Sequence, residues 1–164
     1  MINKFKEKNI FNRVLIILFA SLFSLFTLFN LAWYAYREIR YNPLIEKIPE
    51  SYGIRITSID NYSYSVTKPS YLSFGGNLSL VNEETKEDLI IWPLFPSGYD
   101  YAVTLEISEQ DNSYSSFHML IVDENGDFIK SCGGEKNAER VHSENVDVIQ
   151  NMLLLANEMW KLKE

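Results

Sequence analysis

Residue types that commonly perform chemistry are scarce in this sequence. Its 164 residues include one cysteine, Cys132, and two histidines, His118 and His142. A single cysteine excludes a disulfide within the chain. One thiol and two imidazoles also lack the number and spacing of ligands that a zinc site needs. We therefore predict neither a metal ion nor a cofactor.

Motifs of catalysis and nucleotide binding are also missing. The chain has no phosphate-binding glycine loop, no Gly-x-Ser-x-Gly elbow and no dinucleotide fingerprint. Cys132 could act as a nucleophile with His118 or His142 as its base, but no family signature surrounds it. A small side chain at the end of a strand is the simpler interpretation of Cys132. We expect no catalytic residues and no enzymatic activity.

Charged residues are absent from one long segment, Val14 to Ala35, which is almost wholly apolar. A helix of that length covers about 33 Å, enough to cross the hydrocarbon core of a bilayer. Aromatic and basic side chains lie at the end of this segment and just after it, as at a membrane interface: Trp33, Tyr34, Tyr36, Arg37, Arg40 and Tyr41. The run is longer than the apolar part of a cleaved signal peptide, and no small-x-small cleavage site follows it. The sequence predicts an uncleaved transmembrane anchor over 14–35.

Charge suggests how this anchor is oriented. Residues 1–13 carry Lys4, Lys6, Lys8 and Arg13 against Glu7 alone, which favours a basic tail in the cytoplasm. The net charge of the whole chain is −7, and of its 22 acidic residues all but Glu7 lie after the anchor. An acidic domain repels the phosphates of nucleic acid, and we expect no nucleic acid partner. We predict a single-pass protein of the cell membrane, with residues 51–164 outside the cytoplasm.

The segment between anchor and domain, residues 36–50, is predicted to be a juxtamembrane stalk. Asn42 is suited to cap a short helical turn, Pro43 to occupy its first position, and Pro49 to stop it. From Tyr52 onwards apolar and polar residues alternate with a period of two, which is typical of half-buried antiparallel strands. The clearest alternation runs from Tyr99 to Ile107. We predict six or seven strands, including one at Leu72–Phe74, in a meander.

Helical periodicity returns near the C-terminus. Apolar residues recur three and four positions apart at Val146, Ile149, Leu153, Ala156 and Trp160. Ser143 is the expected cap of this helix. Its apolar face must be buried, most simply against the sheet. The predicted fold class is therefore α+β: a transmembrane helix, an antiparallel sheet and a C-terminal helix packed on it.

The stretch "FHMLIVDENGDFIKSCGG" holds the most suggestive polar residues. Asn125-Gly126 between apolar runs predicts a hairpin with a type I′ turn. A calcium loop is the alternative, because Asp123, Asn125 and Asp127 have the spacing of its first three ligands. That loop also requires glycine at its sixth position and glutamate at its twelfth, and this sequence has neither there. We favour the hairpin.

Two further groups are candidate contact sites. Tyr62, Tyr64, Tyr99 and Tyr101 lie on predicted strands and could form an aromatic face for a ligand or partner, although tyrosine also favours strands without any such role. Within the anchor, the small residues Ala20 and Ser24 lie four apart and would let a second helix approach closely. An ordinary anchor that tolerates small residues is the alternative.

These observations lead to one main hypothesis about function and two alternatives. The main hypothesis is a non-enzymatic module that binds a protein partner as an accessory component of an envelope complex. The alternatives are a domain that binds or senses a ligand, such as a cell-wall sugar, through its tyrosines, and a pilin-like filament subunit. The layout is similar to that of type IV pilins, but their processing site, with a glutamate inside the apolar run, is absent.

Overall fold

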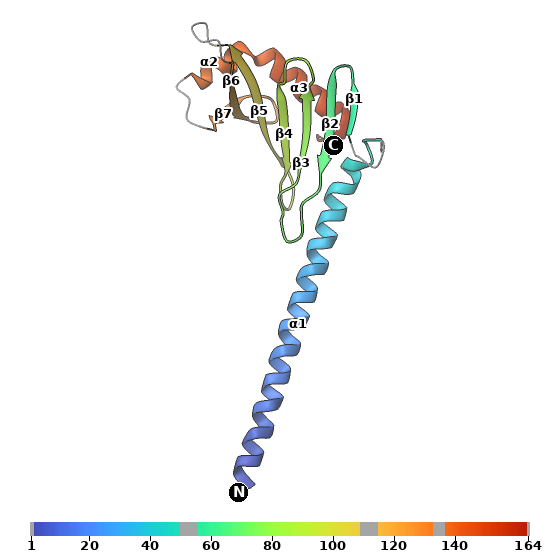
Figure 1. Ribbon diagram of the computed structural model, residues 1–164, viewed down its shortest axis with the longest axis vertical. Coiled ribbons are helices and arrows are strands. Elements are labelled where there is room, and N and C mark those ends of the chain that lie inside the picture. Colours follow the sequence, from blue (N-terminus) through green and yellow to red (C-terminus); the bar gives the residue numbers. More distant parts are fainter. Residues whose placement is uncertain (1, 50–55, 109–114, 133–136, 164) are drawn as a thin grey trace. The chain divides into compact units, whose positions relative to one another are not determined.

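The computed structural model describes residues 2–49, 56–108, 115–132 and 137–163, and the statements below refer to these residues. The chain divides into two compact units, residues 1–39 and 40–164. The first unit is the greater part of α1 (Ile2–Ile45). The second contains the end of α1, a sheet and two further helices (Figure 1).

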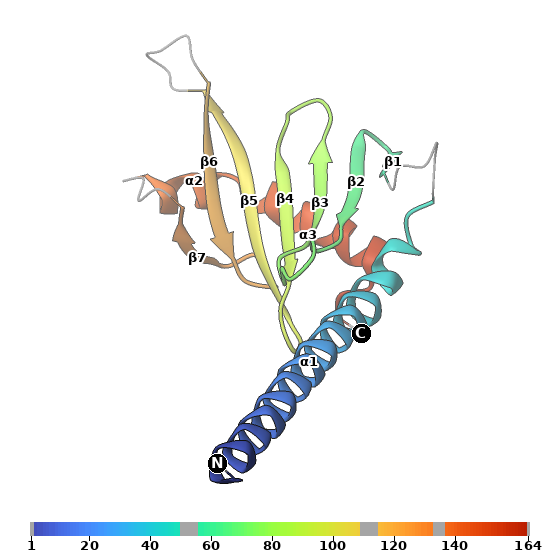
Figure 2. The same ribbon diagram turned by 60° about the horizontal axis from the view of Figure 1, so that its bottom comes forward.

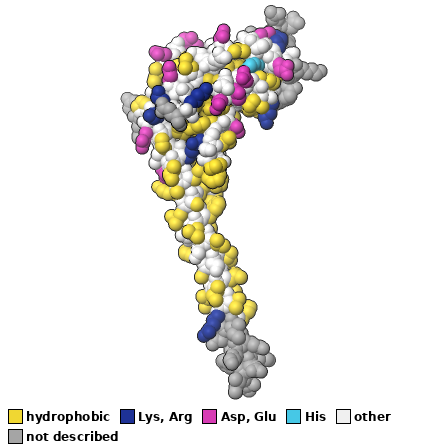
Figure 3. Space-filling view, turned by 180° about the vertical axis from the view of Figure 1, so that it is seen from behind, with side chains coloured by type: hydrophobic (Ala, Val, Ile, Leu, Met, Phe, Trp, Pro, Cys, Tyr) yellow, Lys and Arg dark blue, Asp and Glu magenta, His cyan; other side chains and the backbone are white. Residues whose placement is uncertain are grey.

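Hydrophobic side chains cover much of the face of α1 seen in Figure 3. Among the described residues α1 is the one helix long and apolar enough to cross a membrane, over Phe11–Ile45. Its polar side chains bond to the helix itself: Ser24 Oγ donates to the carbonyl of Ala20 (2.8 Å), and Thr27 Oγ1 to that of Phe23 (2.9 Å). Polar groups satisfied in this way can lie in an apolar surrounding at low cost.

The end of α1 differs from the prediction. Asn42 and Pro43 do not begin a new turn, because α1 continues through Pro43 to Ile45. Proline inside a helix costs about 3 kcal/mol. Here Tyr41 and Leu44 are buried on either side of it, and burial of two such side chains offsets this cost. From Arg40 onwards the segment predicted as a stalk is part of the folded unit, and Leu44 and Ile48 lie in its hydrophobic core.

Seven strands form one antiparallel sheet in which each strand pairs with the next along the chain. The predicted meander is therefore confirmed. The segment Leu72–Phe74 is not a strand, however, and lies in the connection between β2 and β3. The strands are β1 (Ile56–Ile59), β2 (Tyr62–Thr67), β3 (Asn77–Asn82), β4 (Asp88–Pro93), β5 (Tyr99–Ser108), β6 (Ser115–Val122) and β7 (Phe128–Ser131).

Two helices cover one face of this sheet, α2 (Ala138–Glu144) and α3 (Val146–Trp160) (Figures 1 and 2). The core lies between sheet and helices, where Ile149, Met152 and Trp160 of α3 pack against alternate residues of the strands. The strand residues in this core are Tyr64, Leu78, Leu80, Leu89, Ile91, Tyr101, Val103, Leu105, Leu120 and Val122. This confirms the predicted helix packed on the sheet.

The beginning of the C-terminal helix was predicted wrongly. Ser143 lies within α2, where its Oγ donates to the carbonyl of Arg140 (2.8 Å). The cap position of α3 is Asn145, whose Nδ2 donates to the carbonyl of Val141 (2.8 Å) instead of capping α3. Ser143 is drawn into a helix because Ala138 and Val141 are buried in the core.

The β6–β7 connection is a hairpin turn, but not of type I′. That turn needs positive φ at two residues, whereas in the turn 123–127 only Gly126 has it (φ 87°). The Asp123 carboxylate accepts hydrogen bonds from the backbone N–H groups of Asn125 (2.8 Å) and Asp127 (2.9 Å). These bonds lower the pKa of Asp123. The Asp123 side chain therefore stabilises the turn through these hydrogen bonds, and the turn does not require a calcium ion.

A substitution at Gly76 should test how the end of α1 is fixed. A Cβ there would lie 2.5 Å from the Thr67 carbonyl oxygen and 2.7 Å from Tyr41 Cε1, so we expect Gly76→Ala to cost about 1–3 kcal/mol of unfolding free energy. At Gly75 the nearest atom is Ser73 Oγ at 3.7 Å, and Gly75→Ala is the matched control. Denaturant unfolding of the full chain in detergent measures both. Equal effects of the two substitutions would contradict the close contact.

Candidate functional site

The four candidate tyrosines lie on the sheet face that the helices cover. Tyr64 and Tyr101 are core residues, with 4% and 5% of their surface exposed, and Tyr62 and Tyr99 are half-buried against that core. Tyr64 meets Trp160 edge-on, with ring centroids 5.8 Å apart. Two strands separate the pair on β2 from the pair on β5. These side chains do not form one exposed aromatic platform.

Three of the four tyrosines line recesses beside α3: Tyr62 and Tyr64 line one, and Tyr101 lines the other. The recess at Tyr62 and Tyr64 has a volume of about 450 Å³ and is also lined by Asp60 and Glu158. Tyr62 Oη accepts a hydrogen bond from Asn151 Nδ2 (3.2 Å). Burial raises the pKa of Tyr64, and the neighbouring Tyr62, Glu158 and Asp60 raise it further. This recess therefore combines apolar and acidic side chains, and its raised pKa keeps the Tyr64 phenol neutral at physiological pH.

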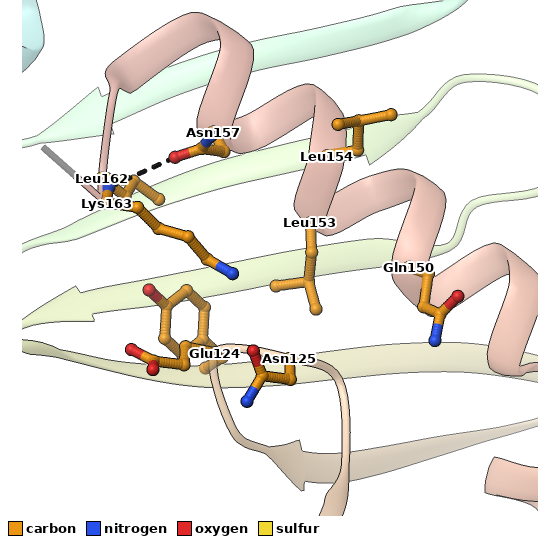
Figure 4. Close-up of a pocket in the computed structure, with 9 residues that line it drawn as sticks. Glu124, Asn125, Gln150, Leu153, Leu154, Asn157, Leu162 and Lys163 are labelled. Carbon is orange, nitrogen blue, oxygen red and sulfur yellow. Dashed lines mark hydrogen bonds between the residues drawn. The ribbon is translucent and has the colours of Figure 1, made fainter.

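The recess at Tyr101 lies between α3 and the β6–β7 turn (Figure 4). Leu153 and Lys163 point into it, and Asn157 Oδ1 accepts a hydrogen bond from the Lys163 backbone N–H (3.2 Å). Burial raises the pKa of Tyr101 to about 12, with Glu124 and Tyr99 contributing. The volume is about 250 Å³, below the roughly 300–1,000 Å³ of typical ligand sites. It is too small to indicate a small-molecule site.

The thiol and the imidazoles are engaged separately. Cys132 is exposed, just beyond the end of β7. His142 Nε2 lies 2.7 Å from the Gly126 carbonyl oxygen, and His118 Nε2 lies 3.0 Å from Ser116 Oγ. No hydrogen bond links Cys132 to either histidine in the part of the chain that the structure describes. Within the same residues no group of three or more His, Cys, Asp or Glu side chains could hold a metal ion.

The opposite side of the sheet carries apolar residues that no helix of the second unit covers, among the residues described (Figure 2). The cross-strand pairs Ile90–Ala102 and Ala102–Ile121 place these three side chains in one row over β4, β5 and β6. Ala102 is fully buried at the bottom of this row, Ile90, Trp92, Met119 and Ile121 are half-buried, and Phe117 is 56% exposed. We call this surface the outer face, defined by Ile90, Trp92, Ala102, Phe117, Met119 and Ile121.

Polar and charged side chains surround the outer face. Ser63 and Ser65 of β2 lie towards one edge of the sheet and Lys130 of β7 towards the other. Asp88, Asp100 and Glu106 alternate onto this same side of their strands. An apolar centre with a polar rim is the usual anatomy of a protein–protein interface. The helix-covered side of the unit instead carries many scattered acidic side chains (Figure 3).

The sequence already contained a signal for the outer face. The runs "LIIWP" and "FHMLIV" are apolar at both alternating positions, as in strands buried on both faces. Strand β6, which contains the second run, pairs with β5 on one side and with β7 on the other, as expected for a strand inside the sheet. The second apolar side was therefore the informative feature, and it lies over β4 and β6.

Ala20 and Ser24, the proposed helix contact, lie on one face of α1. Ser24 Oγ is satisfied by the Ala20 carbonyl, so its hydroxyl does not require a second helix. A helix–helix contact at this position stays a prediction.

Comparison with known proteins does not assign this chain to a family. No family model matches the chain, and neither a curated protein nor a solved structure resembles it significantly.

Asp88 lies on the rim of the outer face, and the pH dependence of stability tests whether its carboxyl group is buried there. Burial raises the pKa of Asp88, although a hydrogen bond from Ser79 Oγ (2.8 Å) acts in the opposite direction. A raised pKa means that the folded state favours the protonated acid. The protein should therefore lose stability as the pH rises from about 4, the ordinary pKa of aspartate, through the higher folded-state value.

We expect Asp88→Asn to abolish that loss and to raise the unfolding free energy by about 0.5–1 kcal/mol at pH 7, with no gain at pH 3. Asp100→Asn, at an exposed position on the same side of the sheet, is the control. Thermal unfolding followed by circular dichroism at both pH values measures the difference. A gain of the same size at pH 3 and pH 7 would refute the role of burial.

Proposed function

We propose that this chain is a single-pass membrane protein whose second unit, outside the cytoplasm, binds another protein as an accessory module of an envelope complex. The length and apolar surface of α1 support the anchor. The basic residues before Val14 support a cytoplasmic N-terminus.

The outer face is the observation that carries the proposed interaction. A monomeric domain seldom leaves an apolar sheet face uncovered, because water contact with such a surface is unfavourable. Trp92, Met119 and Phe117 are residue types enriched at interfaces. The acids of the rim, Asp88, Asp100 and Glu106, favour a partner whose own apolar centre has basic neighbours.

Ligand binding stays the second candidate. The recess of about 450 Å³ beside Tyr62 and Tyr64 falls within the size range of ligand sites. Stacking on a sugar, however, needs an open ring face, and the ring of Tyr64 is buried against Trp160. For this reason we rank protein binding first. A filament role has no comparable observation in its favour.

The exposed thiol of Cys132 tests the orientation. We expect a membrane-impermeant maleimide to label Cys132 in intact cells, because the thiol is accessible and we place its unit outside the cytoplasm. The Cys132→Ser variant is the control for specificity. Labelling that requires permeabilised membranes would place the unit in the cytoplasm and refute the proposed location.

Photo-crosslinking tests the outer face. Phe117 and Leu154 are each 56% exposed, but Phe117 lies on the outer face and Leu154 on α3, which covers the opposite face. A photoreactive phenylalanine derivative in place of Phe117 should form an adduct with another protein in intact cells. The same derivative in place of Leu154 should yield at least tenfold less. Adducts of equal yield from both positions, or none from Phe117, would count against the outer face as the interface.

A further inference from the structure

Two loops of the second unit are fixed to the end of α1. Tyr41 is fully buried, and its hydroxyl accepts a hydrogen bond from the Gly76 backbone N–H (3.2 Å) in the β2–β3 loop, residues 68–76. Arg40 Nη2 donates to the Gly98 carbonyl (2.6 Å) in the β4–β5 loop, residues 94–98, and the guanidinium lies 4.6 Å from the centre of the Tyr99 ring. Because the sheet is a meander, both loops lie at the same end of it.

These loops carry a cluster of exposed apolar side chains. Phe74 and Phe95, one from each loop, have ring centroids 6.2 Å apart, so the two loops present a continuous surface. Phe95 is 68% exposed and Leu72 46% exposed. We call this cluster the loop patch, defined by Tyr71, Leu72, Phe74, Leu94 and Phe95, all of them exposed.

The charge of the loops is unusual for this chain. Residues 68–76 and 94–98 contain no acid, although the net charge of the chain is −7, and their one charged residue is Lys68. Lys68 Nζ donates to Asn42 Oδ1 (2.6 Å). The β6–β7 turn, which lies at this same end of the sheet towards the β7 edge, carries the acids Asp123, Glu124 and Asp127, and Glu38 and Glu46 flank the residues of α1 that contact the loops.

The length of the chain places the loop patch near the membrane. This step rests on the proposed membrane anchor. Arg40 follows Ala35, the last residue of the apolar run, by five positions of a continuous helix, about 7.5 Å along its axis. The polar layer on each side of a bilayer is roughly 5–7 Å thick. Whatever the tilt of the helix, Arg40 and the loops bonded to it lie at the level of the lipid headgroups or just above them.

We infer that the loop patch docks on the lipid surface of the membrane that α1 enters. Aromatic and aliphatic side chains of this kind favour the boundary between headgroups and acyl chains, where Phe95 and Leu72 would insert. Arg40 makes no ion pair among the described residues, so its charge is available to a lipid phosphate. The second unit then contacts the membrane through its loops in addition to its connection to the anchor.

Depth-dependent quenching tests this inference on the full chain. In a Cys132→Ser background, one cysteine is introduced by Phe95→Cys, Leu154→Cys or Phe23→Cys and labelled with a nitrobenzoxadiazole fluorophore. The protein is reconstituted in phosphatidylcholine vesicles that contain a lipid with a nitroxide near its headgroup. We expect at least threefold stronger quenching of the label at position 95 than of the label at position 154, together with a blue-shifted emission. A label introduced by Leu72→Cys should report the same result if the substitution at Phe95 disturbs its loop.

The label at position 23, in the middle of the apolar run, separates the two proposals. If it is shielded from an aqueous quencher while the labels at 95 and 72 are no more quenched by lipid than the label at 154, the anchor stands and the docking surface is refuted. If the label at 23 is open to the aqueous quencher, α1 is not inserted, and both proposals fail. Shielding at 23 with strong lipid quenching at 95 supports both.

Discussion

The two-residue period of the strands is the constraint on which the rest of this structure depends. A sheet exposes two faces, and side chains alternate between them, so each strand must satisfy two environments at once. In this protein the two C-terminal helices cover one face, and Ile149, Met152 and Trp160 bury it. The residues between the core positions then decide the surface chemistry of the other face. Because Ile90, Ala102 and Ile121 are apolar and adjacent across the strands, that face is apolar at its centre.

A second constraint acts at the C-terminal end of α1, which contacts the β2–β3 and β4–β5 loops at one end of the sheet. Arg40 and Tyr41 reach the loops through backbone groups, the carbonyl of Gly98 and the N–H of Gly76. Contacts of this type depend on loop geometry more than on the identity of the loop side chains. The loops can therefore carry apolar residues at their tips while hydrogen bonds at their bases set their positions.

The sequence predicted the elements better than their ends. Alternation identified the strands, since a half-buried strand needs it, and the 3.6-residue period identified α3. The errors occurred where distant residues decide the local structure. Pro43 stays within α1 because Tyr41 is buried beside Gly76, 35 positions later. Ser143 lies within a helix because Val141 is buried, and the β6–β7 turn is formed by the carboxylate of Asp123. The predicted tyrosine face is not an exposed aromatic platform. Strand periodicity predicts which face of the sheet a side chain lies on, but not which element covers that face, and here Tyr64 packs against Trp160 of α3.

The meander also has a consequence for the order in which the chain is made. Each strand pairs with its predecessor, so the sheet can form progressively as synthesis proceeds, with contacts that are short in sequence. The face of the sheet that the helices cover stays exposed to solvent until α3 has been synthesised, because Leu80 and Tyr64 lie in the same core as Trp160 of α3. A nascent or truncated chain that lacks α3 therefore presents apolar surface on both sides of the sheet. Such a chain is a natural substrate for chaperones and quality-control proteases.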